Sequence, residues 1–395
     1  MPRMTPVTPT RRRSRTWRAT FVVLLAAAGL VAACTPETPP PTTTPPSTTP
    51  PVGATEPVVT GRIDGFSRPW DLQFTPDGTP LVTERGGRLA AVIGGVRTVV
   101  ATVSDVKAGG EGGLLGFAVD PDFATNRRVY LCFDSTSGAD VRVVRFRVLP
   151  GYTGIAEATP IVTGIPANGG GRHQGCRVEF GPTGDLWVTT GDAAIPTAPQ
   201  NRASLAGKVL RMSRDGVPSP ANPAASDPGG GWNPYVYTYG HRNVQGLAFR
   251  PSDGAAFSVE HGTDRDDEIN LLSAGANYGW NPVGAPGVYD ESKPMTAPGA
   301  TPAVWSSGYP TIAPSGATFL RGAQWGDREG QLAVAVLKGT RLMLVDLNGS
   351  TVASVDARIT DQGRLRTARM GPDGSLWLVQ DASPGSLLKV TPVTG

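Results

Sequence analysis

The sequence has little of what marks several common classes of protein. Charged residues make up only 17% of its 395 residues, and the formal net charge of +3 is too small to indicate a nucleic-acid partner. The three cysteines include no Cys-x-x-Cys pair, which argues against a zinc site built on cysteine. No long stretch repeats apolar residues at helical spacing, so a helical bundle is excluded.

The chain is instead rich in residues that form turns. It holds 51 glycines and 38 prolines, a composition that favours many short strands joined by turns over long surface helices. Its length allows one large domain or two of ordinary size. We therefore expect an all-β protein.

Residues 1–33 have the pattern of an export signal. Five arginines between residues 11 and 18 precede the apolar run FVVLLAAAGLVAAC, which is shorter than the ~20 residues that span a membrane. The final Val31-Ala32-Ala33-Cys34 resembles a bacterial lipobox, in which cleavage leaves a lipidated cysteine at the new N-terminus. An ordinary signal peptide with an incidental Cys34 is the alternative.

Residues 34–57 form a separate segment of low complexity. After Cys34, the stretch TPETPPPTTTPPSTTPPVGATEP holds nine prolines and almost no large apolar residue. It cannot bury a core and is expected to be an extended, disordered tether. The folded domain is then predicted to occupy residues 58–395. The chain is expected to be exported and anchored to the outer face of the cell membrane by lipid on Cys34.

The two remaining cysteines, Cys132 and Cys176, form an even pair in a chain expected to be exported. In an oxidising compartment such a pair is more often bridged than free. We therefore predict a Cys132–Cys176 disulfide.

A recurring phrase runs along the predicted domain. An apolar strand end leads into a Pro/Asp/Gly turn and then into a second strand of alternating Leu, Trp, Val and Thr. Five clear copies and a sixth, looser one occur at residues 74–84, 119–133, 180–192, 249–262, 370–381 and 319–337. Repeats of this period are typical of a β-propeller, so six copies predict a six-bladed β-propeller. Two stacked β-sandwiches would not explain why one hairpin recurs over the whole length.

Loops that would reach the mouth of a propeller channel carry chemically active side chains. His173 stands in GGGRHQGC, just before a strand of the third copy, and imidazole suits a general base because it titrates near neutral pH. A loop histidine that only caps backbone groups is the alternative. The next copy has His241, Arg242 and Asn243 in the equivalent loop, where the arginine could stabilise negative charge or pair with a blade carboxylate.

Two further groups of charged residues follow later strands. The loop EHGTDRDDEINLL (260–272) gathers acidic side chains that suit calcium, although the spacing does not match an EF-hand and the acids could equally cap the turn. Lys338, Arg364 and Arg366 stand at other strand ends. The two arginines would share one face of a strand and grip a polyanionic ligand, but exposed cations on an edge strand are also common.

Taken together, these segments resemble the glucose/sorbosone dehydrogenase family, which includes soluble PQQ-dependent glucose dehydrogenases and aldose sugar dehydrogenases. The matching phrases occur in the family's order over about residues 60–393. They are PWDLQFTPDGTPLVTERGGRL, GEGGLLGFAVDPDF, RHQGCRVEFGPTGDLWVTTGD, YGHRNVQGLAF, DDEINLLSAGANYGW, YPTIAPSGA, LKGTRL and GRLRTARMGPDG. The combination is specific, whereas no single phrase would be.

The resemblance implies a propeller that binds pyrroloquinoline quinone (PQQ) with Ca²⁺ at the channel mouth. His173 matches the family's catalytic base, which takes the proton from the anomeric hydroxyl of a sugar while hydride passes from C1 to the quinone. Arg242 matches a catalytic arginine beside the quinone oxygens. The other matches are Asn243, Lys338, Arg364 and Arg366 as contacts of PQQ, Gly262 and Thr263 as carbonyl ligands of calcium, and Gln174 and Tyr309 beside the sugar.

Four positions depart from the family pattern. Glu111 stands where the glucose enzyme has a glutamine that touches the cofactor, so a carboxylate would face an anionic quinone unless it is protonated or turned away. Thr263 replaces the usual proline, which is harmless if only its carbonyl is used. Arg172 replaces an acidic neighbour of the base, and Cys176 replaces a small residue. These changes bear on PQQ binding rather than on the fold.

The favoured interpretation is a lipid-anchored, PQQ-dependent aldose dehydrogenase. It would oxidise a sugar to its lactone and pass electrons to an acceptor in the cell envelope. A non-catalytic propeller lipoprotein that binds a glycan or a protein partner is the main alternative, and Glu111 favours it. A calcium-dependent lactonase on the same propeller is a third.

Replacing Cys34 with serine tests the predicted anchor. The Cys34→Ser protein should move from the membrane fraction to the soluble fraction, because serine cannot take the lipid, while the propeller stays folded. Fractionation with immunodetection and the mass of the mature N-terminus measure this. A variant that stays membrane-bound with an uncleaved N-terminus would contradict the lipobox.

Overall fold

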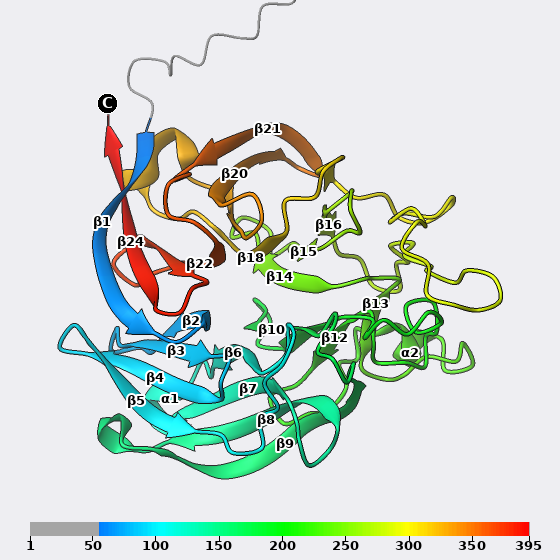
Figure 1. Ribbon diagram of the computed structural model, residues 1–395, viewed down its shortest axis with the longest axis horizontal. Coiled ribbons are helices and arrows are strands. Elements are labelled where there is room, and N and C mark those ends of the chain that lie inside the picture. Colours follow the sequence, from blue (N-terminus) through cyan, green and yellow to red (C-terminus); the bar gives the residue numbers. More distant parts are fainter. Residues whose placement is uncertain (1–54, 395) are drawn as a thin grey trace, which may run out of the picture. The chain divides into compact units, whose positions relative to one another are not determined.

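The computed structural model describes residues 55–394, which form a six-bladed β-propeller (Figure 1). The helices in this part of the chain are short, namely α1 (Phe123–Asn126), α2 (Pro223–Ser226) and the 3-10 segments Pro150–Tyr152 and Ala323–Arg328. None of them is long or apolar enough to cross a membrane. The predicted all-β, six-bladed fold is confirmed. The export signal, Cys34 and most of the predicted tether lie outside the described residues.

Each blade is a four-stranded antiparallel sheet whose first strand lies nearest the centre of the ring, where it lines the central channel (Figure 1). Blade 1 consists of β2 (Pro69–Phe74), β3 (Pro80–Glu84), β4 (Arg88–Ile93) and β5 (Val96–Thr102). Blade 2 consists of β6 (Leu114–Val119), β7 (Arg128–Asp134), β8 (Asp140–Val148) and β9 (Ile155–Pro166). Blade 3 consists of β10 (Gly175–Phe180), β11 (Leu186–Thr190), β12 (Lys208–Met212) and β13 (Val236–Tyr239). Blade 4 consists of β14 (Val244–Phe249), β15 (Ala256–Glu260), β16 (Glu268–Leu271) and β17 (Trp305–Ser306). Blade 5 consists of β18 (Pro314–Phe319), β19 (Leu332–Val336), β20 (Arg341–Asn348) and β21 (Thr351–Arg358). Blade 6 consists of β22 (Leu365–Met370), β23 (Leu376–Gln380), β24 (Gly385–Thr394) and β1 (Thr55–Phe66).

Blade 6 closes the ring because it combines strands from the two ends of the domain. β1 pairs antiparallel with β24, with Val58 opposite Thr391 and Ile63 opposite Leu387 (Figure 1, blue beside red). The ring therefore cannot open without breaking backbone hydrogen bonds. β1 begins at Thr55, slightly before the boundary predicted at residue 58.

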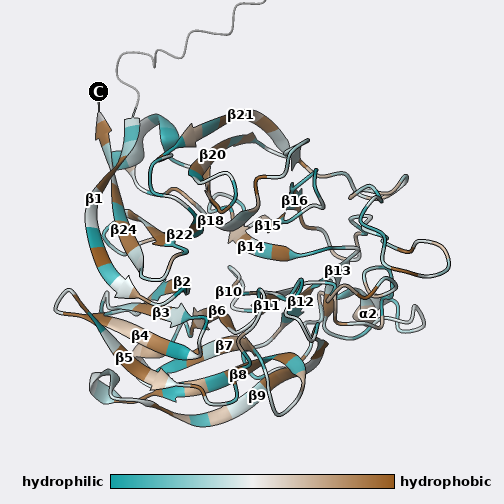
Figure 2. Ribbon diagram, in the orientation of Figure 1, coloured by the Kyte–Doolittle hydropathy of each residue, from teal (hydrophilic) through white to brown (hydrophobic). Residues whose placement is uncertain are grey.

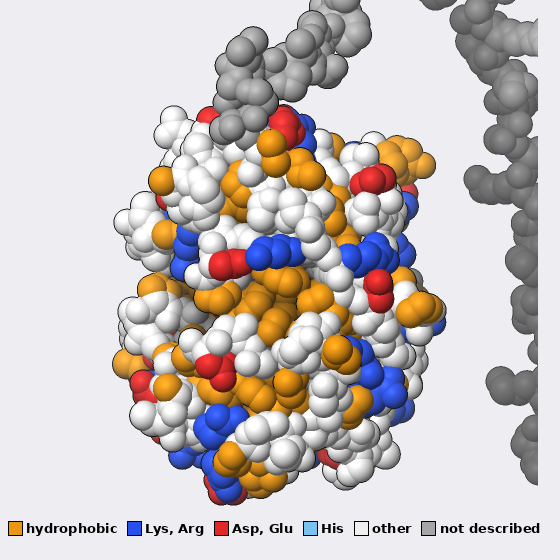
Figure 3. Space-filling model, turned by 90° about the vertical axis from the view of Figure 1, so that its left-hand side faces the viewer, with side chains coloured by type: hydrophobic (Ala, Val, Ile, Leu, Met, Phe, Trp, Pro, Cys, Tyr) orange, Lys and Arg blue, Asp and Glu red, His pale blue; other side chains and the backbone are white. Residues whose placement is uncertain are grey.

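The hydrophobic core lies between neighbouring blades. A middle strand such as β19, with the sequence LAVAV, is buried at every position because its sheet packs against another sheet on each face. Hydrophobic residues accordingly concentrate on the strands, while the connecting loops are largely hydrophilic (Figure 2). Outer strands are more exposed, as at Val96 on β5 and Val58 on β1. Figure 3 views the molecule from the left-hand side of Figure 1 and shows apolar side chains gathered on that surface.

The recurring phrase of the sequence corresponds to the hairpin between the first and second strands of each blade. All six first strands also share an irregularity at their N-terminal end, where the register against the second strand shifts. Such a bulge turns the preceding residues out of the ladder. The six bulges therefore leave six short backbone segments outside the strand pairing, all at the same mouth of the channel.

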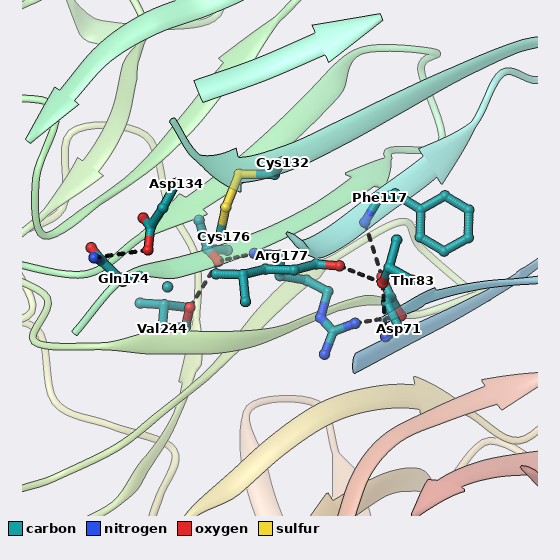
Figure 4. Close-up of a disulfide and its surroundings, with 12 residues drawn as sticks. Asp71, Thr83, Phe117, Cys132, Asp134, Gln174, Cys176, Arg177 and Val244 are labelled. Atoms are coloured by element: carbon teal, nitrogen blue, oxygen red, sulfur yellow. Dashed lines mark hydrogen bonds and ion pairs between the residues drawn. A yellow bond between two sulfur atoms is a disulfide. The ribbon is translucent and has the colours of Figure 1, made fainter. Parts of the chain in front are cut away.

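A buried ion pair crosses the channel between blades 1 and 3. Arg177 Nη1 on β10 lies 2.5 Å from Asp71 Oδ1 on β2, and both side chains are at most 1% exposed (Figure 4). Arg177 also donates to Gln245 O at 3.0 Å and to Thr367 Oγ1 at 3.1 Å, which adds links to blades 4 and 6. One guanidinium therefore connects four blades at the axis.

Breaking this ion pair should destabilise the propeller. Asp71→Asn should lower the free energy of unfolding by about 3–5 kcal/mol, because it leaves a buried, uncompensated guanidinium. The double variant Asp71→Asn, Arg177→Met should recover much of the loss, since no unpaired charge then remains. Equilibrium denaturation measures both. Asp64→Asn at the exposed Arg62–Asp64 pair is the control and should change stability little; equal losses in Asp71→Asn and this control would contradict the account.

Candidate active site

The candidate residues converge because each hairpin is antiparallel. The start of a first strand and the end of a second strand lie at the same end of the blade. Segments before the first strands carry Arg68, Glu111, His173, Arg242 and Arg364. Segments after the second strands carry Arg85, Asp192, Gly262, Lys338 and Asp381. Residues far apart in the sequence thus meet around one channel mouth.

His173 is buried at this mouth and held by a carboxylate. Its side chain is 5% exposed, and Nδ1 lies 2.8 Å from Asp192 Oδ1. Asp192 Oδ1 also accepts from Ala194 N, while Oδ2 accepts from Trp280 Nε1 at 2.7 Å and from Tyr289 OH at 2.5 Å. Because the Asp192 carboxylate accepts this hydrogen bond, the His173 proton lies on Nδ1 and Nε2 is left as the proton acceptor.

Burial is the main influence on the titration of His173. It lowers the pKa of the imidazole, and the positive charge of Arg242 acts in the same direction. The hydrogen bond to Asp192 opposes this shift because it favours the protonated ring. The net direction is downward, so the ring is neutral and able to accept a proton at neutral pH.

Three side chains of this site come from one long connection, of which the sequence analysis noted only the first part, in the matching phrase that ends at Trp280. Trp280, Tyr289 and Glu291 all lie between β16 and β17. Glu291 pairs with Arg242 through both carboxylate oxygens, at 3.0 and 3.1 Å from Nη2, and it also pairs with Arg172. The base, its carboxylate and Arg242 are thus covered by one loop of blade 4.

Arg242 and Asn243 have definite partners. Arg242 is 7% exposed and, besides Glu291, donates from Nη1 to His261 O at 3.1 Å. Asn243 donates from Nδ2 to Glu111 Oε2 at 3.0 Å and accepts from Gly175 N at 3.1 Å. Glu111 is therefore turned toward an amide donor, in the neighbourhood of His173.

Next to this cluster lies a cavity of about 460 Å³ with a strongly basic lining. It is lined by the four arginines Arg68, Arg85, Arg364 and Arg366, together with Glu111 and Asp381. Arg366 donates from Nη2 to Asp381 Oδ2 at 2.7 Å, which offsets one charge. The buried Nε atoms of Arg85 and Arg366 have no hydrogen-bond partner within residues 55–394.

The electrostatics of this cavity favour an anionic ligand. Burial lowers the pKa of Arg85, and so does the positive charge of Arg366, while Asp381 opposes them. Excess positive charge and unpartnered N–H groups are what a polycarboxylate would satisfy. Arg68 and Arg85 were missed by the sequence analysis, although Arg85 lies in one of its matching phrases. Its place directly after a second strand was the available signal.

The predicted calcium segment is a tight loop at the same mouth. Asp267 Oδ1 accepts from Gly262 N at 2.9 Å, and Oδ2 accepts from Ile312 N and Ala313 N. This carboxylate therefore caps turns, as the sequence left open. The carbonyl oxygens of Gly262 and Thr263 accept no hydrogen bond from the described residues. No cluster of three acidic, His or Cys side chains there could hold a metal, so any cation would depend on such carbonyls.

The remaining candidates differ in their surroundings. Tyr309 is 75% exposed, and Lys338 donates to Thr311 Oγ1 at 3.1 Å on the rim. Gln174 is 2% exposed, and its Nε2 donates to Asp134 and to Asn168 O, so its amide supports the loop in this structure. His241 is buried between Thr238 and Glu260, which is the structural role of a core histidine.

The Asp192–His173 contact makes a testable prediction. Asp192→Asn should lower the pKa of His173 further, because it removes the group that stabilises the charged ring while burial stays the same. With three histidines in the chain, ring NMR can follow each titration separately. His241 serves as the internal control. A His173 titration that moves to higher pH in the variant would contradict the assignment.

Comparisons with known proteins agree with this architecture. The model of the family described as Glucose / Sorbosone dehydrogenase matches residues 66–389. The chain is 32% identical to the aldose sugar dehydrogenase YliI of Escherichia coli, over 83% of this chain and 91% of that protein. It is 32% identical to quinoprotein glucose dehydrogenase B of Acinetobacter calcoaceticus, over 55% of this chain and 51% of that protein.

A solved structure of an aldose sugar dehydrogenase also matches this chain. The PQQ-bound aldose sugar dehydrogenase of Streptomyces coelicolor superposes with a TM-score of 0.72 at 33% identity, covering 87% of this chain and all of that one. The predicted Cys132–Cys176 disulfide is also present, with an S–S distance of 1.95 Å. On its fold, its site and these matches, the chain belongs to the glucose/sorbosone dehydrogenase family, as its sequence predicts.

Proposed function

We propose that this protein oxidises an aldose sugar to its lactone with PQQ as cofactor and Ca²⁺ as its counter-ion. The observation that carries the proposal is the position of a neutral, carboxylate-held histidine beside a cavity lined by four arginines. Relatives at 32–33% identity are named aldose sugar dehydrogenase, and one of them is a PQQ-bound structure. The non-catalytic alternative has no comparable support, because a glycan-binding surface needs no buried base.

The arginine cavity fits the cofactor by its chemistry. PQQ carries three carboxylates, and Arg68, Arg85, Arg364 and Arg366 offer guanidinium groups, two of them with buried N–H groups unpartnered within the described residues. When bound, PQQ supplies the two-electron acceptor for the oxidation. The backbone carbonyls of Gly262 and Thr263 are the candidate ligands for calcium, with Lys338 on the rim nearby. Glu111 is compensated by the amide of Asn243 and by the positive charge of Arg85.

The chain's own residues account for proton transfer. His173 Nε2 accepts the proton of the sugar's anomeric hydroxyl, and Asp192 stabilises the imidazolium that forms. Arg242, beside the base, stabilises negative charge that develops on oxygen. Tyr309, exposed at the rim, offers an aromatic surface to the sugar. Gln174 reaches a sugar only if it leaves Asp134.

The cellular context is part of the same proposal. The arginine-rich, apolar N-terminal segment ending at Cys34 supports export and a lipid anchor, and the proposed acceptor of the electrons is a component of the cell envelope.

Two substitutions separate catalysis from cofactor binding. His173→Ala should lower kcat by about 10²–10⁴-fold and leave PQQ affinity nearly unchanged, because it removes the base and no cofactor contact. Arg364→Ala should instead weaken PQQ affinity and leave kcat at saturating PQQ nearly unchanged. PQQ titration by absorbance and steady-state kinetics on an aldose panel measure both effects. Arg147→Ala, near the end of β8 that lies away from the mouth, is the matched arginine control. A His173→Ala enzyme with unchanged kcat would contradict the assigned base.

A further inference from the structure

Two contacts join blade 2 to the segment that carries His173. The Cys132–Cys176 disulfide links β7 to the start of β10. Asp134, two residues further along β7, accepts a hydrogen bond from Gln174 Nε2 at 3.2 Å (Figure 4). Strand residues two apart share a face, so Cys132 and Asp134 point the same way. The two contacts therefore hold residues 174 and 176, directly after the base.

Residues 173–176 have a backbone conformation that must be stabilised by their surroundings. His173, Gly175 and Cys176 have positive φ angles of 55°, 62° and 77°. Residues with a side chain pay a free-energy cost in this region and stay there only where their surroundings impose it. The ladder cannot impose it here, because the register between β10 and β11 is interrupted between Gly175 and Val178.

Other contacts grip the same segment from the opposite side. Gly175 N donates to Asn243 Oδ1 at 3.1 Å, and His173 O accepts from Ala193 N at 3.3 Å. These partners belong to the segments that follow β11 and precede β14. The segment is therefore fixed between blade 2 on one side and blades 3 and 4 on the other, and only the blade 2 side includes a covalent bond.

The residues around the disulfide are also tightly packed. Cys132 and Cys176 are both fully buried, in a core that also contains Tyr130 and Val178. A Cβ atom on Gly116 of β6 would lie 2.3 Å from Cys176 O, so blade 2 approaches this residue at backbone distance. The segment has no room to shift toward blade 2 while the bridge is intact.

We propose that Cys132, Cys176 and Asp134 are positioning residues for the catalytic base. Through the disulfide and the Gln174 contact they fix the backbone of residues 173–176 and so direct the His173 imidazole into the channel mouth. A misplacement of about 1 Å can cost on the order of 10²-fold in rate, so a loosened segment would slow proton transfer without unfolding the blade. The kinetic part rests on the proposed function, whereas the ordering of His173 does not.

The test removes each contact separately. Cys132→Ala with Cys176→Gly deletes the bridge, and glycine tolerates the positive φ at position 176. Asp134→Ala deletes the second contact, and Asp134→Asn keeps an oxygen that can accept from Gln174. Tyr130→Phe is the matched control, since it lies on the same face of β7 but loses only a hydrogen bond to Asp120 at the other end of the strand. Thermal unfolding shows how far each variant is destabilised.

The first readout is ring NMR of the three histidines in the cofactor-free protein. In the double cysteine variant and in Asp134→Ala, the His173 signals should broaden or split and its titration should move up toward about 6.5, the value for a solvated ring. His241 should stay unchanged, and Asp134→Asn and Tyr130→Phe should resemble the wild type. A sharp His173 signal with an unchanged titration in the double cysteine variant would overturn the proposal.

The second readout is kinetic and uses enzyme saturated with PQQ. The double cysteine variant should lose about tenfold or more in kcat, with KM and PQQ affinity within about twofold of the wild type. Tyr130→Phe should keep its kcat even if its stability falls. Equal kcat losses in these two variants would assign the effect to general destabilisation and overturn the proposal. A wild type that oxidises no sugar would refute the proposed function alone, and NMR would still decide the positioning role.

Discussion

The antiparallel pairing of β1 with β24 is the contact on which the rest of the structure depends. It closes the ring and brings blade 6 against blade 1. The basic cavity lies across this closure, with Arg68 and Arg85 from blade 1 facing Arg364, Arg366 and Asp381 from blade 6. If the chain closed the ring within another blade, the ring would still have six blades, but the four cavity arginines would no longer lie across the closing pair of strands.

The charges at the mouth are balanced in two different ways. Around the base, each charge has a partner, because Asp192 has four donors and Arg242 is paired with Glu291. In the cavity, four arginines face two carboxylates. The protein therefore keeps a neutral, oriented imidazole at neutral pH and leaves its excess positive charge where an anionic cofactor would neutralise it. This division separates the residues that move a proton from those that hold the cofactor.

The sequence predicts those features that depend on short segments. The hairpin phrase predicts six blades, and parity of cysteines predicts the bridge between Cys132 and Cys176. His173, Arg242 and Arg366 were found because they stand beside recognisable strand ends. Tyr289 and Glu291 were not, since the long connection that carries them has no repeat pattern. Gln174 was placed beside the sugar, yet its amide faces Asp134, an orientation that depends on blade packing.

The most direct test of the account is an equilibrium titration of cofactor-free protein with PQQ in the presence of Ca²⁺, followed by addition of an aldose while the absorbance of the bound cofactor is recorded. We expect one PQQ per chain, bound at micromolar concentration or below, with a spectrum that changes to that of the reduced cofactor when the sugar is added. A protein that binds no PQQ under these conditions, or that binds it without any change on addition of sugars, would contradict the central claim.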